Sequence, residues 1–464
     1  MKFDLIIKGG TIITAAETYR ADIGISGGKI TAVATTLTGG KKTVDAKGRI
    51  VIPGGVDVHT HLDMPFMGAT TADDFASGTT GAVCGGTTSI IDFAIQGKGD
   101  SLYKALETWH GKADGKCAAD YGFHMIISDL QQQQLKEMDS LVRDGVTTFK
   151  LFLAYPGIFL TDDNTIFKAL LRTRENGGMI MMHAENGSVI DLIVADSLAK
   201  GKTAPRHHAL SRPIAAEVES TYRSIKLAEM AGAPMYIVHL TAGDAMDEVR
   251  RARERGSEIY AETCPQYLYL SHDDYCRPGF EGAKFVMSPP LRPKGNQERL
   301  WDGVRQNWLQ IVSTDHCSFN MKGSKKSPGK ELGRKSFAKI PNGAPGLETR
   351  MMLLWDAVAE GRITANRFVD ITATTPAKLF GLYPQKGTIA PGADADIAII
   401  NPKKPFRIGY KKLHMKVDYN PYEGRTVKGS IQDVFLRGKR MVDNGKFVGR
   451  LGDGRFLKRA PRMC

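Results

Sequence analysis

Two histidines, His59 and His61, stand one residue apart at the end of an apolar run that begins at Ile50. If this run is a strand, alternate side chains point to the same face, so both imidazoles would project in one direction. Neutral imidazole is a common ligand of zinc-like ions, and two side by side suit one such ion. Two hydrogen-bonded surface histidines are the alternative, and for an isolated His-x-His pair they are the commoner case.

Further residues that could do chemistry lie in or at the end of other apolar runs: Lys150, His183, His239 and Asp315. A single histidine at the end of a strand is more often a hydrogen-bonded structural residue than a metal ligand. The choice between these interpretations depends on whether the residues meet at one place. That is decided by the elements that carry them.

The middle of the chain alternates short apolar runs with amphipathic stretches. The apolar runs are Ile50–Val58, Thr87–Ala94, Tyr121–Ile127, Thr147–Ala154, Met179–Ala184, Met235–Leu240, Glu258–Thr263 and Ile311–Thr314. Such alternation is typical of βα units and a parallel sheet. Eight runs predict an α/β protein with a (β/α)8 TIM-like barrel over residues 53–385, and a doubly wound sheet is the second choice.

In such a barrel the carboxyl ends of the strands converge on one mouth, where active sites lie. The prediction therefore brings one set of residues into a single basin: His59, His61, Lys150, His183, His239 and Asp315. Four histidines at the same end of one barrel are poorly explained as separate structural residues. We therefore interpret the basin as a metal site.

Lys150 is the unusual member of this set. A cationic amine would repel metal ions, and burying it without its charge costs desolvation free energy. A salt bridge to Asp315 is one interpretation. The other is that the neutral amine reacts with carbon dioxide to give a carbamate, whose two oxygens can bridge two metal ions ~3.5–4 Å apart. Composition leaves both open.

Both ends of the chain differ from the middle in having short β-type runs separated by glycine pairs such as Gly9-Gly10 and Gly27-Gly28. This hairpin spacing returns after Asp396. We expect a small β-sandwich domain formed by both chain ends, residues 1–52 and 386–440. A basic tail, residues 441–464, would follow as a possible subunit contact.

The composition narrows the class of protein. Much of the net charge of +13 sits in the loop Lys322 to Lys335 and in the tail, without a nucleic-acid motif or stacking aromatics, so no nucleic-acid partner is expected. No apolar run has membrane-spanning length, and the first residues lack a signal-peptide pattern. Six scattered cysteines without a Cys-x-x-Cys pair indicate reduced thiols in a cytoplasmic protein.

Six short segments form a distinctive combination. They are Gly54–Phe66 (GGVDVHTHLDMPF), Cys84–Thr88 (CGGTT), Phe149–Tyr155 (FKLFLAY), Glu262–Leu268 (ETCPQYL), Ser288–Arg292 (SPPLR) and Ser313–Cys317 (STDHC). Together they resemble the cyclic amidohydrolases, and more narrowly the dihydropyrimidinase and D-hydantoinase branch. The resemblance runs over nearly the whole chain, including both β-rich ends.

This resemblance implies a pair of divalent metal ions, zinc in the family. By position, the more buried ion would take His59, His61 and Asp315, the other His183 and His239, with carbamylated Lys150 as the bridge. The nucleophile would be a metal-bridging hydroxide. Asp315 would act first as general base and then as general acid. The family also implies a homotetramer.

The resemblance assigns further residues to the substrate. Tyr155 would donate to the developing oxyanion, and backbone groups at Ser288 and Asn342 would hold the ring. Asp57 would orient a ligand histidine. His207 and His208 match no ligand position and are expected to be structural.

Apolar residues of the loops after the first and fourth strands could line a pocket for a ring substituent: Met64, Pro65, Phe66, Phe152, Tyr155 and Phe159. Dihydroorotases and allantoinases usually carry an arginine or asparagine after the histidine pair, which Leu62–Pro65 lacks. We therefore expect ring opening of 5,6-dihydropyrimidines or 5-substituted hydantoins. An allantoinase or dihydroorotase is the alternative. A non-catalytic interaction scaffold of the same fold ranks lower, because all six ligand positions are filled.

Overall fold

The computed structural model describes residues 2–325 and 327–461, so residue 326 of the basic loop and residues 462–464 of the tail lie outside the described residues. Within them, eight parallel strands form the predicted barrel sheet. In spatial order these are β6 (Gly55–Thr60), β9 (Thr87–Ile95), β10 (Asp120–Ile126), β11 (Thr148–Phe152), β12 (Met179–His183), β13 (Met235–Ile237), β14 (Ile259–Thr263) and β15 (Ile311–Val312). The barrel closes after β15, where the His61 amide donates to the His316 carbonyl at 2.8 Å.

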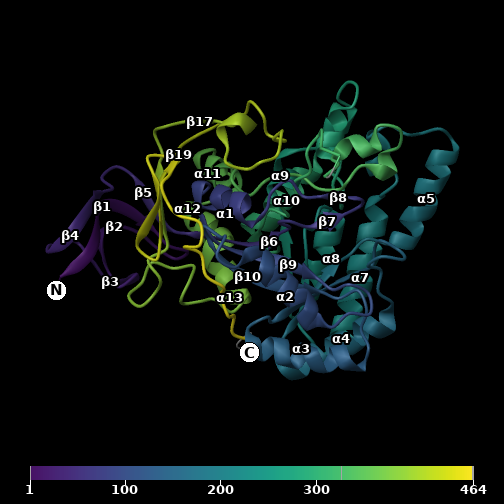
Figure 1. Cartoon of the computed structure of the whole chain (residues 1–464), viewed down its shortest axis with the longest axis horizontal. Coiled ribbons are helices and arrows are strands. Elements are labelled where there is room, and N and C mark those ends of the chain that lie inside the picture. Colours follow the sequence, from purple (N-terminus) through teal and green to yellow (C-terminus); the bar gives the residue numbers. More distant parts are fainter. Residues whose placement is uncertain (1, 326, 462–464) are drawn as a thin grey trace.

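Helices connect successive strands and cover the barrel (Figure 1). The longer ones are α1 (Phe75–Cys84), α2 (Leu102–Ala113), α3 (Gln132–Asp144), α4 (Asp163–Asn176), α5 (Gly187–Ala199), α7 (Ile214–Ala231), α8 (Gly243–Glu254), α10 (Asn296–Arg305) and α11 (Arg350–Ala359). Short helices are α6 (Arg206–Leu210), α9 (Pro265–Tyr269), α12 (Ala365–Val369) and α13 (Thr375–Leu379). The side chains of Asp74, Ser101 and Asp162 cap α1, α2 and α4, which fixes where these helices begin. In the described part of the chain, none of the helices is long and apolar enough to cross a membrane.

The first apolar run, predicted as one barrel strand from Ile50 to Val58, is divided between two sheets. β5 (Ile50–Pro53) pairs with strands of the terminal sheet, and the barrel begins only with β6. The Gly54 amide donates to the carbonyl of Asp396, just before β16 of the terminal sheet, and the Gly55 amide donates to the carbonyl of Gly86, just before β9 of the barrel. A Cβ at Gly54 would lie 2.2 Å from Oγ1 of Thr88, so only glycine allows this crossing.

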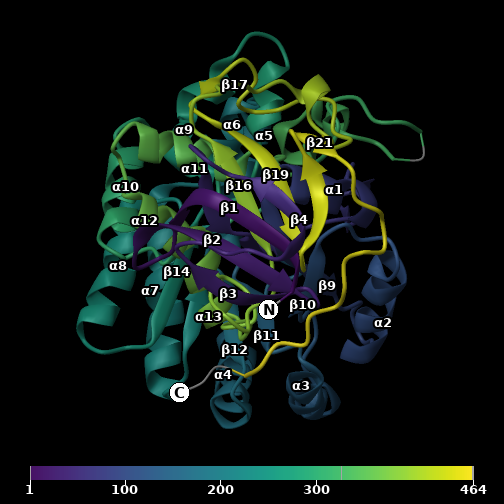
Figure 2. The ribbon, with the colours of Figure 1, turned by 90° about the vertical axis from the view of Figure 1, so that its left-hand side faces the viewer.

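Strands from both chain ends form one further sheet, seen face on in Figure 2. It contains β1 (Phe3–Ile13), β2 (Thr18–Ser26), β3 (Lys29–Ala34), β4 (Gly40–Asp45), β5, β16 (Ile397–Asn401), β19 (Ser430–Leu436), β20 (Lys439–Asp443) and β21 (Lys446–Phe447). Its side chains alternate between two cores, since Ile397 and Ile399 face an apolar cluster within the sheet, whereas Ala398 and Ile400 face the barrel core. Because alternate side chains of β16 pack into the barrel core, apolar contacts join the terminal sheet to the barrel. Two short ribbons, β7 (Pro65–Phe66) with β8 (Ala69–Thr70) and β17 (Phe406–Arg407) with β18 (Thr426–Val427), lie outside both sheets.

The last strand of the terminal sheet, β21, ends at Phe447. Beyond it, the tail that the sequence suggested as a subunit contact packs, up to residue 461, against its own barrel. The Tyr121 amide of β10 donates to the Arg455 carbonyl at 3.0 Å, and the Leu457 amide donates back to Tyr121 at 2.7 Å. Arg459 is buried and donates to the Phe123 carbonyl. Part of the basic charge of the tail therefore belongs to side chains that pack within this chain.

Candidate metal centre

The six predicted ligand residues meet at the carboxyl-terminal mouth of the barrel. His59 lies in β6 and His61 follows it; Lys150 lies in β11, His183 ends β12, His239 follows β13 and Asp315 follows β15. All six are buried, and the most accessible, Asp315, exposes 8% of its surface. All except His59 line one pocket. The structure thus brings together every residue of the predicted ligand set.

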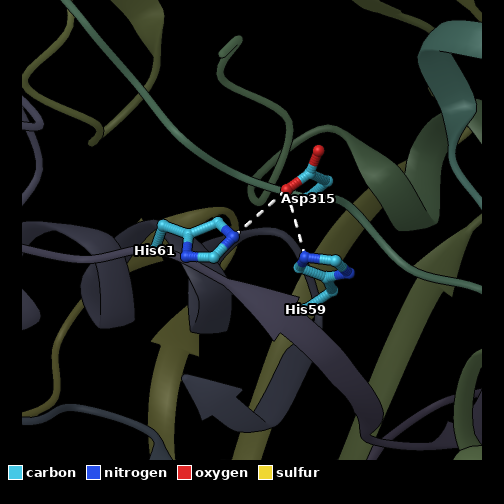
Figure 3. Close-up of side chains that lie close together, drawn as sticks. All are labelled: His59, His61 and Asp315. Atoms are coloured by element: carbon cyan, nitrogen blue, oxygen red, sulfur yellow. Dashed lines mark ion pairs between the residues drawn. The ribbon is translucent and has the colours of Figure 1, made fainter. Parts of the chain in front are cut away.

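The His59, His61 and Asp315 side chains form the tightest group (Figure 3). Oδ1 of Asp315 lies 3.2 Å from Nε2 of His59 and 3.3 Å from Nε2 of His61. One donor atom from each residue lies within 4.8 Å of the others. Ligands of a tetrahedral zinc ion are spaced by about 3.3–3.8 Å, so small side-chain movements suffice for one shared ion.

The second group consists of His183 and His239, and Lys150 lines the same pocket. Nδ1 of His183 is 2.9 Å from Nε2 of His239. Nζ of Lys150 is 3.1 Å from Nε2 of His59 and lies 4.4 Å from the centre of the Phe93 ring. Within the described residues, Lys150 forms no direct ion pair with Asp315, so the salt-bridge interpretation is not what this structure shows.

Burial sets the charge state of these ligands. It lowers the pKa of His59 and His239 well below the usual value, and the pKa of His61 below it, so the imidazoles are neutral and their lone pairs available. Burial also lowers the pKa of Lys150 to about 8. Nδ1 of His61 and Nδ1 of His239 are buried without a hydrogen-bond partner. Neutral imidazoles, a carboxylate and a partly deprotonated amine fit divalent metal ions.

Glu262, in β14, organises the mouth without being a predicted ligand. Its Oε1 contacts Nδ1 of His59 and accepts the His239 backbone amide at 3.1 Å, while its Oε2 accepts the Tyr236 hydroxyl at 2.9 Å. A carboxylate that holds Nδ1 presents Nε2 of His59 to the metal side. Sequence reasoning missed this residue, although an acidic residue inside a buried strand was a usable signal.

Asp57 was expected to orient a ligand histidine, and in the structure it contacts the backbone of His59 rather than its ring. Its Oδ1 accepts the backbone amides of His59 and Thr314, and its Oδ2 accepts the Thr314 hydroxyl at 2.7 Å. Asp57 therefore fixes the main chain of β6 to the segment that carries Asp315. The imidazole of His59 is held by Glu262 instead.

Three residues of the mouth have left-handed backbone conformations. The φ angles are 38° for His239, 49° for Asp315 and 61° for Tyr155. Such values are uncommon for residues with a side chain and persist only where surrounding contacts enforce them. The Glu262 contact to the His239 amide is one such enforcing contact.

The pocket above the ligand group carries the predicted substrate residues. It holds about 500 Å³ including its open mouth, and Tyr155, Ser288 and Asn342 are among its lining residues. Burial, followed by the Glu185 charge, raises the pKa of Tyr155 to about 12. Oγ of Ser288 is buried without a hydrogen-bond partner in the described structure. The pocket therefore has a protonated phenol to offer a ligand.

One wall of the pocket is apolar and largely aromatic. Its residues are Met64, Phe66, Ile95, Ile126, Phe152 and Phe159. The rings of Phe66, Tyr155 and Phe159 pack on one another, with centroids 5.5–6.3 Å apart. Both interpretations from the sequence hold here, because these side chains pack together and also line the pocket. Pro65 does not line it.

His207 and His208 lie in α6, away from the ligand groups, as expected. Nε2 of the buried His208 lies 2.7 Å from the carbonyl of Met287 and donates to it. This contact supports the segment that leads into Ser288. His208 is therefore structural but adjacent to the substrate side of the pocket.

A closed parallel barrel whose mouth gathers buried, neutral metal-ligand side chains defines the class of metal-assisted barrel hydrolases. The sequence matches the amidohydrolase family over residues 50–441. The chain belongs to this family, and within it to the dihydropyrimidinase and hydantoinase group.

Individual relatives are similar over their full length. A D-hydantoinase of Streptomyces coelicolor is 52% identical over 461 residues, covering 98% of both chains. A D-hydantoinase of Geobacillus stearothermophilus is 48% identical, covering 98% of this chain and 96% of the relative. Among solved structures, a dihydropyrimidinase from Brevibacillus agri superposes with a TM-score of 0.97 at 48% identity, covering 100% of both chains.

Proposed function

We propose that this protein hydrolyses a ring C–N bond of cyclic ureides or imides. The substrates are 5-substituted hydantoins or 5,6-dihydropyrimidines (dihydrouracil, dihydrothymine), and the products are the N-carbamoyl amino acids. The observation that carries the proposal is the convergence of six donor side chains, one of them a buried lysine, around one pocket. The names D-hydantoinase and dihydropyrimidinase of the relatives support this substrate class.

The donor set supports two divalent ions, zinc by ligand type. His59, His61 and Asp315 would hold one ion and His183 and His239 the other. Lys150, carbamylated on Nζ, would bridge them; its contact with His59, its place in the same pocket as His183 and His239, and its lowered pKa support this role. When bound, the two ions lower the pKa of a water molecule and polarise the scissile carbonyl.

The protein's own side chains would then transfer protons and stabilise the developing charge. Asp315 lies in the pocket lining, where it takes a proton from the attacking water and returns it to the leaving ring nitrogen as the C–N bond breaks. Tyr155, protonated at neutral pH because of its raised pKa, donates to the oxygen on which negative charge develops. Backbone groups at Ser288 and Asn342 pair with the –CO–NH– edge of the ring.

The apolar wall favours a neutral ring with an apolar substituent over acidic or strongly polar substrates. Of the described residues that line the pocket, Lys150 is the one cationic side chain, and it belongs to the metal group. Dihydroorotate would therefore bring a carboxylate without a cation to meet it, which costs desolvation free energy. An inactive scaffold is disfavoured because all six ligand positions are filled.

The test is a hydrolysis panel of phenylhydantoin, dihydrouracil, dihydroorotate and allantoin, with metal analysis of the same preparation. We expect at least two ions per chain, and kcat/KM for the first two substrates higher on the order of 10²-fold, because a pocket that leaves a polar group unpaired discriminates strongly. Faster turnover of dihydroorotate or allantoin would reassign the substrate. Loss of all four activities in metal-loaded protein would support the scaffold instead.

The homotetramer, the cytoplasmic location and the division into residues 1–52, 53–385, 386–440 and 441–464 stay predictions. Sedimentation at several protein concentrations tests the homotetramer.

A further inference from the structure

A second group of metal-type side chains lies away from the barrel mouth. Cys84 is the last residue of α1, Glu348 precedes α11, and His414 follows the short helix η6 (Tyr410–Lys412). One donor atom from each of the three lies within 4.8 Å of the others. Three segments that are distant in sequence thus place a thiol, a carboxylate and an imidazole together.

Glu348 is the centre of this group. Its Oε1 lies 2.8 Å from Nδ1 of His414, and its Oε2 accepts the His414 backbone amide at 2.6 Å. Two glycines let Glu348 approach α1 closely. A Cβ at Gly85 would lie 2.5 Å from the Glu348 carbonyl oxygen, and a Cβ at Gly81 would lie 3.3 Å from Oε2. The last turn of α1, which carries Cys84, is therefore held against Glu348.

An ion pair between Glu348 and His414 accounts for two members of the group but leaves Cys84 unexplained. Cys84 is half-buried, and burial together with the Glu348 charge raises the pKa of its thiol. A divalent cation reverses this preference, since it displaces the thiol proton to solvent and is neutralised by the thiolate and carboxylate together.

We propose that Cys84, Glu348 and His414 form a further metal site, separate from the barrel mouth, for one ion of the Zn²⁺ or Co²⁺ class. Thiolate, imidazole and carboxylate are the ligand types that zinc takes, at bond lengths of about 2.0–2.3 Å. The three residues line a hollow of about 690 Å³, its open side included, from which water completes the coordination.

Lys404 and Lys412 line the same hollow and oppose a cation. Both are exposed, and their long side chains can extend into solvent. His414 retains 32% of its side-chain surface accessible, so an ion can reach it. The thiolate and the carboxylate together neutralise one divalent ion. The occupied site therefore has no net charge, which limits its repulsion by the two lysines.

The expected role of this ion is structural. The segment after His414 continues to Lys416, whose amide donates to Asp73 at 2.7 Å, and to Asp418, which accepts the Met321 amide at 2.7 Å. A metal ion would tie this segment to α1 and α11. It would stabilise the fold without entering the reaction.

Cobalt distinguishes this site from the mouth, because a thiolate ligand gives a sulfur-to-cobalt charge-transfer band in the near ultraviolet. The proposed mouth ligands carry only nitrogen and oxygen donors. The full-length protein, with zinc at the mouth, is titrated with CoCl₂ alone. We expect one further cobalt ion per chain, the thiolate band and a higher Tm. Cys84→Ala and His414→Ala should lose all three effects while keeping zinc content and hydrolysis.

The matched control is Cys276→Ser, which removes the exposed thiol of η1 (His272–Cys276) and should keep the band. Retained hydrolysis shows that each variant is folded, and Cys84→Ser replaces Cys84→Ala if the alanine variant is not. A wild-type protein without the band would overturn the proposal. A band that persists in both Cys84 variants would place the thiolate elsewhere, for example at Cys317 beside Asp315, and would overturn it equally.

Discussion

Among single residues, Glu262 connects three separate parts of the site. It contacts the ring of His59, the backbone of His239 and the hydroxyl of Tyr236 from one buried carboxylate. It is fully buried, so none of these partners can be replaced by water. A residue in this position sets the orientation of the metal ligands.

Glu262→Gln should weaken metal binding about 10–100-fold, because a neutral amide lacks the negative charge with which the carboxylate strengthens His59 as a ligand. Competition with a chelator of known affinity measures the change. Tyr236→Phe is the matched control, since it removes only the contact to Oε2 and should have a smaller effect. Unchanged affinity in Glu262→Gln would contradict the orienting role.

Asp315→Asn separates binding from proton transfer. The amide oxygen keeps a ligand atom near His59 and His61, but it cannot take a proton from water. We expect metal content to be retained and kcat to fall by on the order of 10²–10⁴-fold. Metal analysis and kcat are measured on the same sample. A near-normal kcat would remove Asp315 from proton transfer.

Among the elements, the connection from β15 to α11 shapes the substrate side of the pocket. Lys330 begins the short helix η3 (Lys330–Gly333) within it and is fully buried. Its Nζ donates to the Val286 carbonyl at 2.8 Å and the Pro341 carbonyl at 3.0 Å. These carbonyls stand shortly before Ser288 and Asn342, so one amine fixes both segments that we propose to contact the substrate.

Lys330→Met should leave two buried carbonyls unsatisfied and lower the free energy of unfolding by about 1–3 kcal/mol. KM should rise more than kcat falls, because the metal ligands are untouched. Steady-state kinetics and denaturant unfolding measure the two effects. The exposed Lys325→Met, in the same connection, is the control and should change neither.

The stability difference between the wild type and Lys330→Met should depend on pH. Burial lowers the pKa of Lys330 to about 7, against an ordinary value of 10.5. Between these values the unfolded chain binds a proton that the folded chain has lost, so wild-type stability gains with rising pH, by at most about 1.4 kcal/mol per unit. The difference in unfolding free energy, wild type minus Lys330→Met, should therefore increase from pH 7 to pH 10. A flat difference would contradict a lowered pKa.

In the whole molecule, a buried ion cluster connects the barrel to the terminal sheet. Nζ of Lys386 lies 2.6 Å from Asp120 of β10, 2.9 Å from Asp394 and 2.7 Å from Asp396. Arg437, after β19, also contacts Asp120. Lys386 exposes 1% of its side chain, and it is the buried cation that all three carboxylates share.

Lys386→Met should lower the free energy of unfolding by about 3–5 kcal/mol, because it leaves several carboxylates buried without their shared cation. Lys29→Met provides the matched control. Lys29 pairs with Asp394 at 2.6 Å but is 45% exposed, so its loss should cost at most about 1 kcal/mol. Denaturant unfolding measures both. Equal effects would show that burial does not govern the cluster.

The sequence alone determined the barrel and most of the metal centre. Strand periodicity places His59 and His61 on one face, and the rule that strand ends converge brings Asp315 to them; both follow from local pattern and strand polarity. The resemblance to the cyclic amidohydrolases extended this to the assignment of Tyr155 to the pocket.

Tertiary structure alone decided the features that depend on contacts between distant segments. Only packing shows that Glu262, not Asp57, holds the ring of His59, because the choice depends on which carboxylate faces Nδ1 across the barrel. The crossing of the chain at Gly54 likewise depends on Thr88 of another strand. A sequence pattern records which face a residue takes along its own strand, but not what stands opposite to it.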